Sequence, residues 1–123
     1  MKIHALSEAL TVCRVESYQT VDFSRPLVFI GKTDEENSLV AETEYVPQNV
    51  LAREDGWRAF RIEGVLDFCL VGILSGILNV LKDSGIGVFT VSTYNTDYIL
   101  VKEERFHEAL NALDEAGYEI TGR

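Results

Sequence analysis

The sequence of 123 residues has few of the residues that build disulfides and metal sites. It contains two cysteines and two histidines. Cys13 and Cys69 lie far apart in the chain, each among apolar residues, and no CxxC pair occurs. We interpret both as small buried hydrophobic residues in a reducing compartment, where disulfides are rare. A reactive thiol stays open as an alternative at Cys69, because it lies near a predicted helix start.

Positive charge is also scarce, with 11 Lys and Arg against 20 Asp and Glu, a net charge of −9. A surface with this charge repels phosphate backbones and anionic lipids. Nucleic acids and membrane surfaces are therefore excluded as expected partners. The longest apolar-rich run, residues 65–81, contains Asp67 and is shorter than the roughly 20 residues that cross a bilayer. The N-terminus has no apolar signal-peptide segment, so we expect a cytoplasmic protein.

The motifs of common catalytic and cofactor sites are missing. His4 and His107 stand in different predicted elements, without a second metal ligand at a suitable spacing. No GxGxxG or GxxxxGK[ST] loop occurs, and Ser75 does not stand in a GxSxG motif. We therefore expect no catalytic residue, no metal and no cofactor, and the protein is predicted not to be an enzyme.

The first half of the chain has the pattern of short strands joined by turns. Strands are predicted at residues 2–6, 10–15, 27–32 and 38–45, from β-branched and apolar runs separated by polar turns. The polar segment 31–37 predicts a hairpin between the third and fourth strands. Pro26 and Pro47 argue against long helices here. The short polar segment 52–56 ends in glycine and is interpreted as the boundary between a region 1–55 and a region 56–123.

The second half combines strands and helices. Apolar residues recur three and four apart between Leu66 and Leu81, which predicts a helix over about 68–84 with Asp67 as its N-cap and Gly85 as its stop. A second helix is predicted from Glu103 to Gly117. Strands are predicted at 57–62, 87–93, 98–102 and 118–120. The order β-α-β-β-α-β is the ferredoxin-like plan of an α+β fold, with two helices on one face of an antiparallel sheet.

Polar residues follow two of these strands, and we expect them to form a cleft. Residues 63–70 lead from a strand through a glycine to a helix N-terminus, whose free N–H groups can hold a carboxylate. Residues 92–97 supply hydroxyls, an amide and a carboxylate at the end of the strand after the first helix, which we expect to neighbour the first strand. Such a cleft suits a zwitterion. The alternative is that Asp67 only caps the helix and Asp97 only shapes a turn.

The same segments resemble the small bacterial ACT-domain proteins, which are similar to the ACT domains of the arginine sensors called CASTOR proteins. The resemblance rests on GWRAFRIEGVLDF at 56–68, GIL at 72–74 and VSTYNTDYILV at 91–101. LTVCRV at 10–15 resembles the opening of the family, whose N-terminal segment forms a reduced, mostly β ACT-like half. The resemblance therefore implies such a half at 1–55 and an ACT domain at 56–123.

The resemblance also implies amino-acid binding, regulation and pairing of ACT units, with a homodimer as the expected assembly. In the related sensors the ligand contacts the loop before the first helix and the end of the following strand. Carried over to this sequence, the ligand-binding positions are Glu63, Gly64, Leu66, Asp67, Phe68, Thr93, Asn95 and Asp97. Among them, Asp97 is the best candidate partner for a ligand ammonium or guanidinium group.

Two functions are consistent with this sequence. The first is a regulatory module that binds a small molecule, most simply an amino acid, and changes the pairing of its ACT units when occupied. The alternative is a structural or protein-interaction module without a bound metabolite. The position of Asp97 discriminates between them. A carboxylate at the mouth of a polar cleft favours binding, whereas one engaged with nearby backbone N–H groups favours the interaction module.

Overall fold

The computed structural model describes residues 1–63 and 72–123, which form two compact units. The large unit comprises Met1–Ser7 and Arg58–Arg123, and the small unit comprises Glu8–Trp57. In this division the first seven residues belong with the C-terminal part of the chain, while the domains that we expected at 1–55 and 56–123 stay a prediction.

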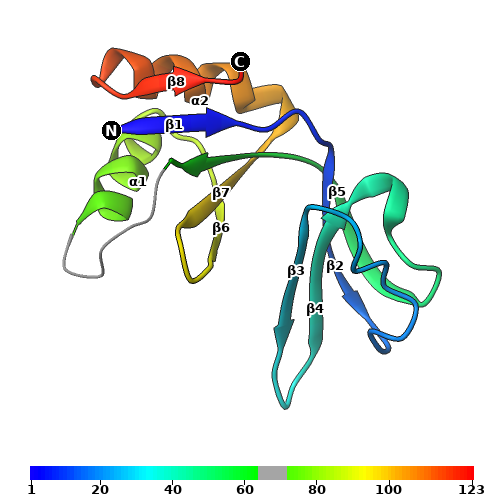
Figure 1. Cartoon of the computed structure of the whole chain (residues 1–123). Coiled ribbons are helices and arrows are strands. Elements are labelled where there is room, and N and C mark those ends of the chain that lie inside the picture. The colour runs from blue at the N-terminus through cyan, green and yellow to red at the C-terminus, as the bar shows by residue number, and fades with distance from the viewer. Residues whose placement is uncertain (64–71) are drawn as a thin grey trace. The chain divides into compact units, whose positions relative to one another are not determined.

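The large unit has the expected ferredoxin-like order of elements (Figure 1). Its elements are the end of β5 (Val50–Ile62), α1 (Ile73–Asp83), β6 (Phe89–Ser92), β7 (Asp97–Lys102), α2 (Glu103–Glu115) and β8 (Glu119–Thr121). The α+β fold class and the β-α-β-β-α-β order are therefore confirmed.

One strand is added to this plan from the other end of the chain. Strand β1 (Lys2–Ala5) lies between β5 and β8, antiparallel to the first and parallel to the second. The strand order across the large unit is thus β8-β1-β5-β7-β6. Ile3 of β1 is fully buried in the core that both helices share with this sheet, together with Ile62 and Phe106. Burial of apolar surface therefore fixes β1 in the large unit.

Helix α1 begins later than the sequence pattern predicts. It starts at Ile73 rather than near residue 68, and its N-cap is Gly72 with φ of 90°. Asp67, which we expected to cap this helix, lies outside the described residues. The predicted stop is confirmed, because Gly85 follows the C-cap with φ of 70° and its N–H donates to the Lys82 carbonyl.

The small unit is a four-strand antiparallel arrangement with its own core. Its strands lie in the order β3 (Val28–Lys32), β4 (Asn37–Glu42), β2 (Leu10–Val15) and the first part of β5. The predicted hairpin is confirmed by the pairing of β3 with β4. Strand β4 ends at Glu42 rather than at residue 45, and a short 3-10 helix, η1 (Thr43–Tyr45), follows it. Cys13, Leu39 and Ala41 are buried in the core of this unit.

The polar segment 52–56, which we interpreted as a boundary, is part of a strand. Strand β5 has 13 residues, and its first part pairs with β2 through backbone hydrogen bonds. The register shifts where Leu10 opposes Trp57 and Val12 opposes Glu54, which leaves one extra residue in β5. Gly56 adopts φ of 86° there, as in a G1 bulge. The charged side chains of this segment are exposed, so polarity does not oppose strand formation.

Candidate functional site

The turn between β6 and β7 is tied to the end of β5. The hydroxyl of Thr96 donates to the carbonyl of Ile62 at 2.7 Å, and this contact is buried. Within the turn, the backbone N–H and the hydroxyl of Thr93 both donate to the Thr96 carbonyl, at 2.8 and 2.9 Å. The turn and the end of β5 therefore lie together. We had expected β6, the strand after the first helix, to pair with β5, but β7 is the strand that pairs with it. That expectation is corrected by the strand order, since β6 pairs only with β7 among the described strands.

An open pocket of about 330 Å³ lies at this junction. The residues that line it are Arg61, Ile62, Glu63, Thr93, Asn95, Thr96 and Tyr98. Three residues of the predicted site, Glu63, Thr93 and Asn95, are thus brought together. Sequence reasoning missed Arg61, although it precedes Glu63 by two positions in an extended chain and so faces the same side.

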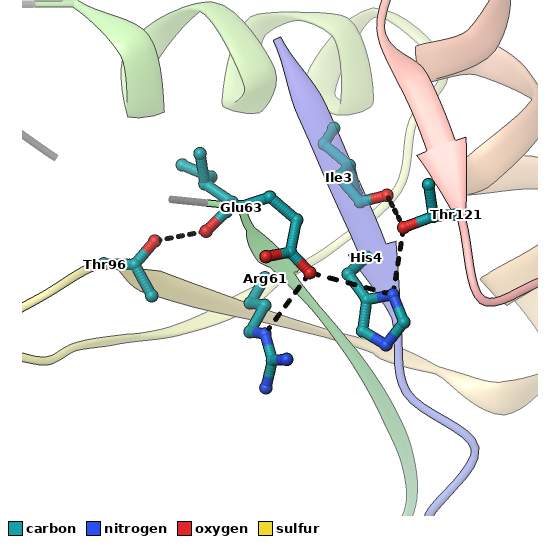
Figure 2. Close-up of polar contacts among 7 residues, drawn as sticks. Ile3, His4, Arg61, Glu63, Thr96 and Thr121 are labelled. Atoms are coloured by element: carbon teal, nitrogen blue, oxygen red, sulfur yellow. Dashed lines mark hydrogen bonds and ion pairs between the residues drawn. The ribbon is translucent and has the colours of Figure 1, made fainter. Parts of the chain in front are cut away.

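Opposite charges meet on one side of the pocket (Figure 2). One oxygen of Glu63, Oε1, lies 3.8 Å from Nε of Arg61 and 3.8 Å from Nδ1 of His4. These three side chains are each about one-third exposed, at 36%, 35% and 32%. At 3.8 Å neither contact is a hydrogen bond, so the Glu63 carboxylate is held only loosely.

Asp97 does not line this pocket. Its Oδ1 accepts a hydrogen bond of 2.5 Å from the hydroxyl of Ser92, which opposes it across the β6–β7 hairpin. Tyr98, the next residue, does line the pocket, in keeping with the alternation of side chains along a strand. The other predicted positions, Gly64, Leu66, Asp67 and Phe68, lie outside the described residues.

We also searched the described residues for a metal site, an exposed thiol and a membrane-spanning helix. Within residues 1–63 and 72–123, no group of three or more His, Cys, Asp or Glu side chains is placed to hold a metal ion. His107 is exposed on α2. Cys13 is a buried free cysteine, and burial raises the pKa of its thiol. In the same described ranges, no helix is long and apolar enough to span a bilayer.

Comparison with known proteins identifies the family. The ACT domain family model matches residues 52–115, which covers the strands and helices around the pocket. The chain belongs to the ACT-domain family. No curated protein matches the sequence closely. The ACT resemblance that the sequence suggested is thus confirmed, whereas the closer similarity to the CASTOR proteins stays a prediction.

Solved structures share the fold of this ACT protein. A protein of Agobacterium tumefaciens has a TM-score of 0.85 and 28% identity, over 97% of this chain and 90% of that one. A protein of Vibrio cholerae has a TM-score of 0.73 and 22% identity, over 93% and 88%. The ligand-free regulatory subunit of aspartate kinase from Thermus thermophilus has a TM-score of 0.68 and 8% identity, over 95% and 97%. ACT domains are regulatory rather than catalytic units.

Proposed function

We propose that this ACT protein is a regulatory module that binds an amino acid, or a similar small zwitterion, in the pocket at the end of β5. The observation that carries the proposal is the pair of opposite charges on one side of that pocket. Arg61 offers a planar guanidinium that suits a carboxylate, and Glu63 offers an acceptor for an ammonium group. Asn95 and Thr93 add uncharged polar groups beside them.

The loose contact between Arg61 and Glu63 supports an exchange of partners on binding. A partly exposed ion pair at 3.8 Å contributes little to stability, so separating the two groups costs little. A zwitterion would give each of them a new partner of opposite charge. The other residues carried over from the family, including Asp67 and Asp97, stay predictions for the same ligand.

Regulation would follow from linkage between the ligand and the pairing of ACT units. A ligand shifts an equilibrium between two arrangements only if it binds one of them more tightly. ACT domains generally dimerise, so a second copy of this chain is the proposed partner. A ligand-dependent change in that pairing would be the output of the module.

A thermal-shift screen of the full chain with the twenty amino acids, each at millimolar concentration, tests the proposal. Saturation to 100 times Kd should add about 2.7 kcal/mol of stability. For a chain of this size that corresponds to a rise in Tm of about 10 °C. We expect one amino acid, or a chemically related group, to give such a shift. Arg61→Gln and Glu63→Gln should each lose most of it.

Arg53→Gln is the matched control, because Arg53 pairs with Asp55 in the small unit and is not part of the pocket. This variant should keep the full shift. A shift that persists unchanged in both pocket variants would place the ligand elsewhere on the protein.

The second candidate function, an interaction module without a metabolite, is favoured by one observation. Asp97 is engaged by Ser92 and is not among the residues that line the pocket. If no amino acid shifts the Tm of the wild-type protein, this second function becomes the better account.

A further inference from the structure

His4 contacts Glu63, one of the residues that line the pocket. Because β1 lies between β5 and β8, His4 has neighbours on both sides. It opposes Arg61 on β5 and Thr121 on β8. Its Nδ1 lies 2.9 Å from the Thr121 hydroxyl and 3.8 Å from Glu63 Oε1 (Figure 2). His4 itself is not part of the pocket lining, so any effect on a ligand would pass through Glu63.

The Thr121 hydroxyl has two hydrogen-bond partners, the Ile3 carbonyl and the His4 ring. The Thr121 hydroxyl donates its single hydrogen to the Ile3 carbonyl at 3.4 Å. A protonated ring has hydrogens on both nitrogens, so its Nδ1 can donate to the Thr121 oxygen while that hydroxyl donates to Ile3. The contact with Thr121 is therefore compatible with the charged ring. The ring can therefore become a cation in place, beside the Glu63 carboxylate.

The charged groups around His4 have both signs. Strand β5 contributes Arg61 and Glu63, while Lys2 precedes His4 by two residues on β1. On β8, Glu119 opposes Lys2. Arg61 and Lys2 are positively charged, whereas Glu63 and Glu119 are negatively charged. Among these groups, Glu63 forms the ion-pair contact with the ring and also lines the pocket.

We propose that His4 is a pH-sensitive positioning residue of the pocket: the protonated ring holds the Glu63 carboxylate and thereby weakens the binding of a ligand ammonium group. The inference rests on the proposed function. Histidine is the side chain whose ordinary change of charge falls between pH 5 and 8. The imidazolium and the ligand ammonium then compete for one carboxylate. For a partly exposed pair, we expect Kd to rise about threefold between pH 8 and pH 5.5.

The contact between His4 and Glu63 is tested first, in the full chain without a ligand. The ring signals of both histidines are followed by NMR as the pH is lowered. Glu63→Gln should move the midpoint of His4 to lower pH, because the neighbouring negative charge is gone. His107, exposed on α2, should keep its midpoint and serves as the control in the same spectra. An unchanged His4 midpoint would overturn the inference.

The effect on binding is tested with each of the twenty amino acids that stabilises the wild-type protein at pH 8. Its Kd is measured by calorimetry at pH 8 and pH 5.5. His4→Asn places an amide donor near the position of Nδ1 but cannot become a cation, and His107→Asn is the matched control. The wild type and the control should show the threefold rise in Kd, whereas His4→Asn should show none.

The outcomes separate this inference from the function on which it rests. A threefold rise that survives in His4→Asn would overturn the role of His4 and leave the amino-acid site standing. Failure of all twenty amino acids to bind at pH 8 would overturn the proposed function, and the role of His4 with it, whatever the NMR midpoints show.

Discussion

One buried hydroxyl, that of Thr96, joins the β6–β7 turn to the end of β5. Thr96 is 8% exposed, and its hydrogen bond to the Ile62 carbonyl is 2.7 Å long. Valine has nearly the same shape but cannot donate. Thr96→Val therefore leaves a buried carbonyl without this donor, and we expect a loss of about 1–2 kcal/mol in the free energy of unfolding. Urea denaturation measures that loss.

Thr90→Val is the control for this prediction. Thr90 lies on β6 and is exposed, so the same chemical change should alter the free energy of unfolding by less than about 0.5 kcal/mol. Equal effects of the two substitutions would show that the Thr96 hydroxyl does not fasten the turn.

At the scale of an element, the bulge in β5 depends on one glycine. Gly56 adopts φ of 86°, and a Cβ added there would meet no atom within 4 Å. A larger residue at this position would therefore be destabilised by the left-handed backbone conformation and not by a steric clash. We expect Gly56→Ala to lower the free energy of unfolding by about 1–2 kcal/mol, and Gly56→Asn by less, since asparagine tolerates the left-handed region. Chemical denaturation of both variants measures the difference.

Gly31→Ala in β3 is the matched control. Gly31 does not have a positive φ, and an added Cβ would make an ordinary contact of 3.6 Å with Ser38. This substitution should be close to neutral or slightly stabilising. An equally small effect of Gly56→Ala would contradict the left-handed conformation of Gly56 at the bulge.

Local sequence signals predicted the elements that depend on near neighbours. Strand β2 was predicted at its observed bounds, and the β3–β4 hairpin follows from the polar turn between two apolar runs. Helix α2 begins at Glu103 as predicted and ends shortly before Gly117. Strand β5 was predicted only from Trp57 onward, because its first part is charged and exposed. Pairing with β2 makes that part a strand, and a distant partner leaves no trace in the local pattern.

The same limit applies to the candidate site. Glu63, Thr93 and Asn95 were carried over from the family resemblance, and the polar segments that contain them follow strands that we expected to be neighbours. Arg61 could have been added from its two-residue spacing to Glu63. His4 could not, because its contact with Glu63 depends on the pairing of the first strand with β5, far away in the sequence. The contact that the sequence did not reveal is therefore the one that depends on long-range strand pairing.

At the scale of the whole molecule, the large unit contains strands from both ends of the chain, β1 and β8. Ile3 and Ala5 of β1 are 0% and 2% exposed in its core. The bonds from Glu63 N–H to the Lys2 carbonyl and from Leu6 N–H to the Ala59 carbonyl extend the pairing of β1 with β5. A fragment 58–123 would lack this strand, leave the facing edges of β5 and β8 unpaired and open the core. We expect it not to unfold cooperatively in urea, as followed by circular dichroism.

A direct connection of β1 to β5 should restore that cooperativity. Ala5 opposes Phe60 in the antiparallel pair, and the next pair along, Leu6 and Ala59, is joined by the bond from Leu6 N–H to the Ala59 carbonyl. A two-residue Asn-Gly turn suits such a pair, since its type I′ geometry matches the twist of antiparallel strands. Met1–Leu6 joined through Asn-Gly to Ala59–Arg123 should therefore fold and show a single cooperative transition. Exchanging Ile3 for Asp in this shortened chain should abolish the transition, because it places a charge in the core. Cooperative folding of 58–123 without β1 would contradict the role assigned to that strand.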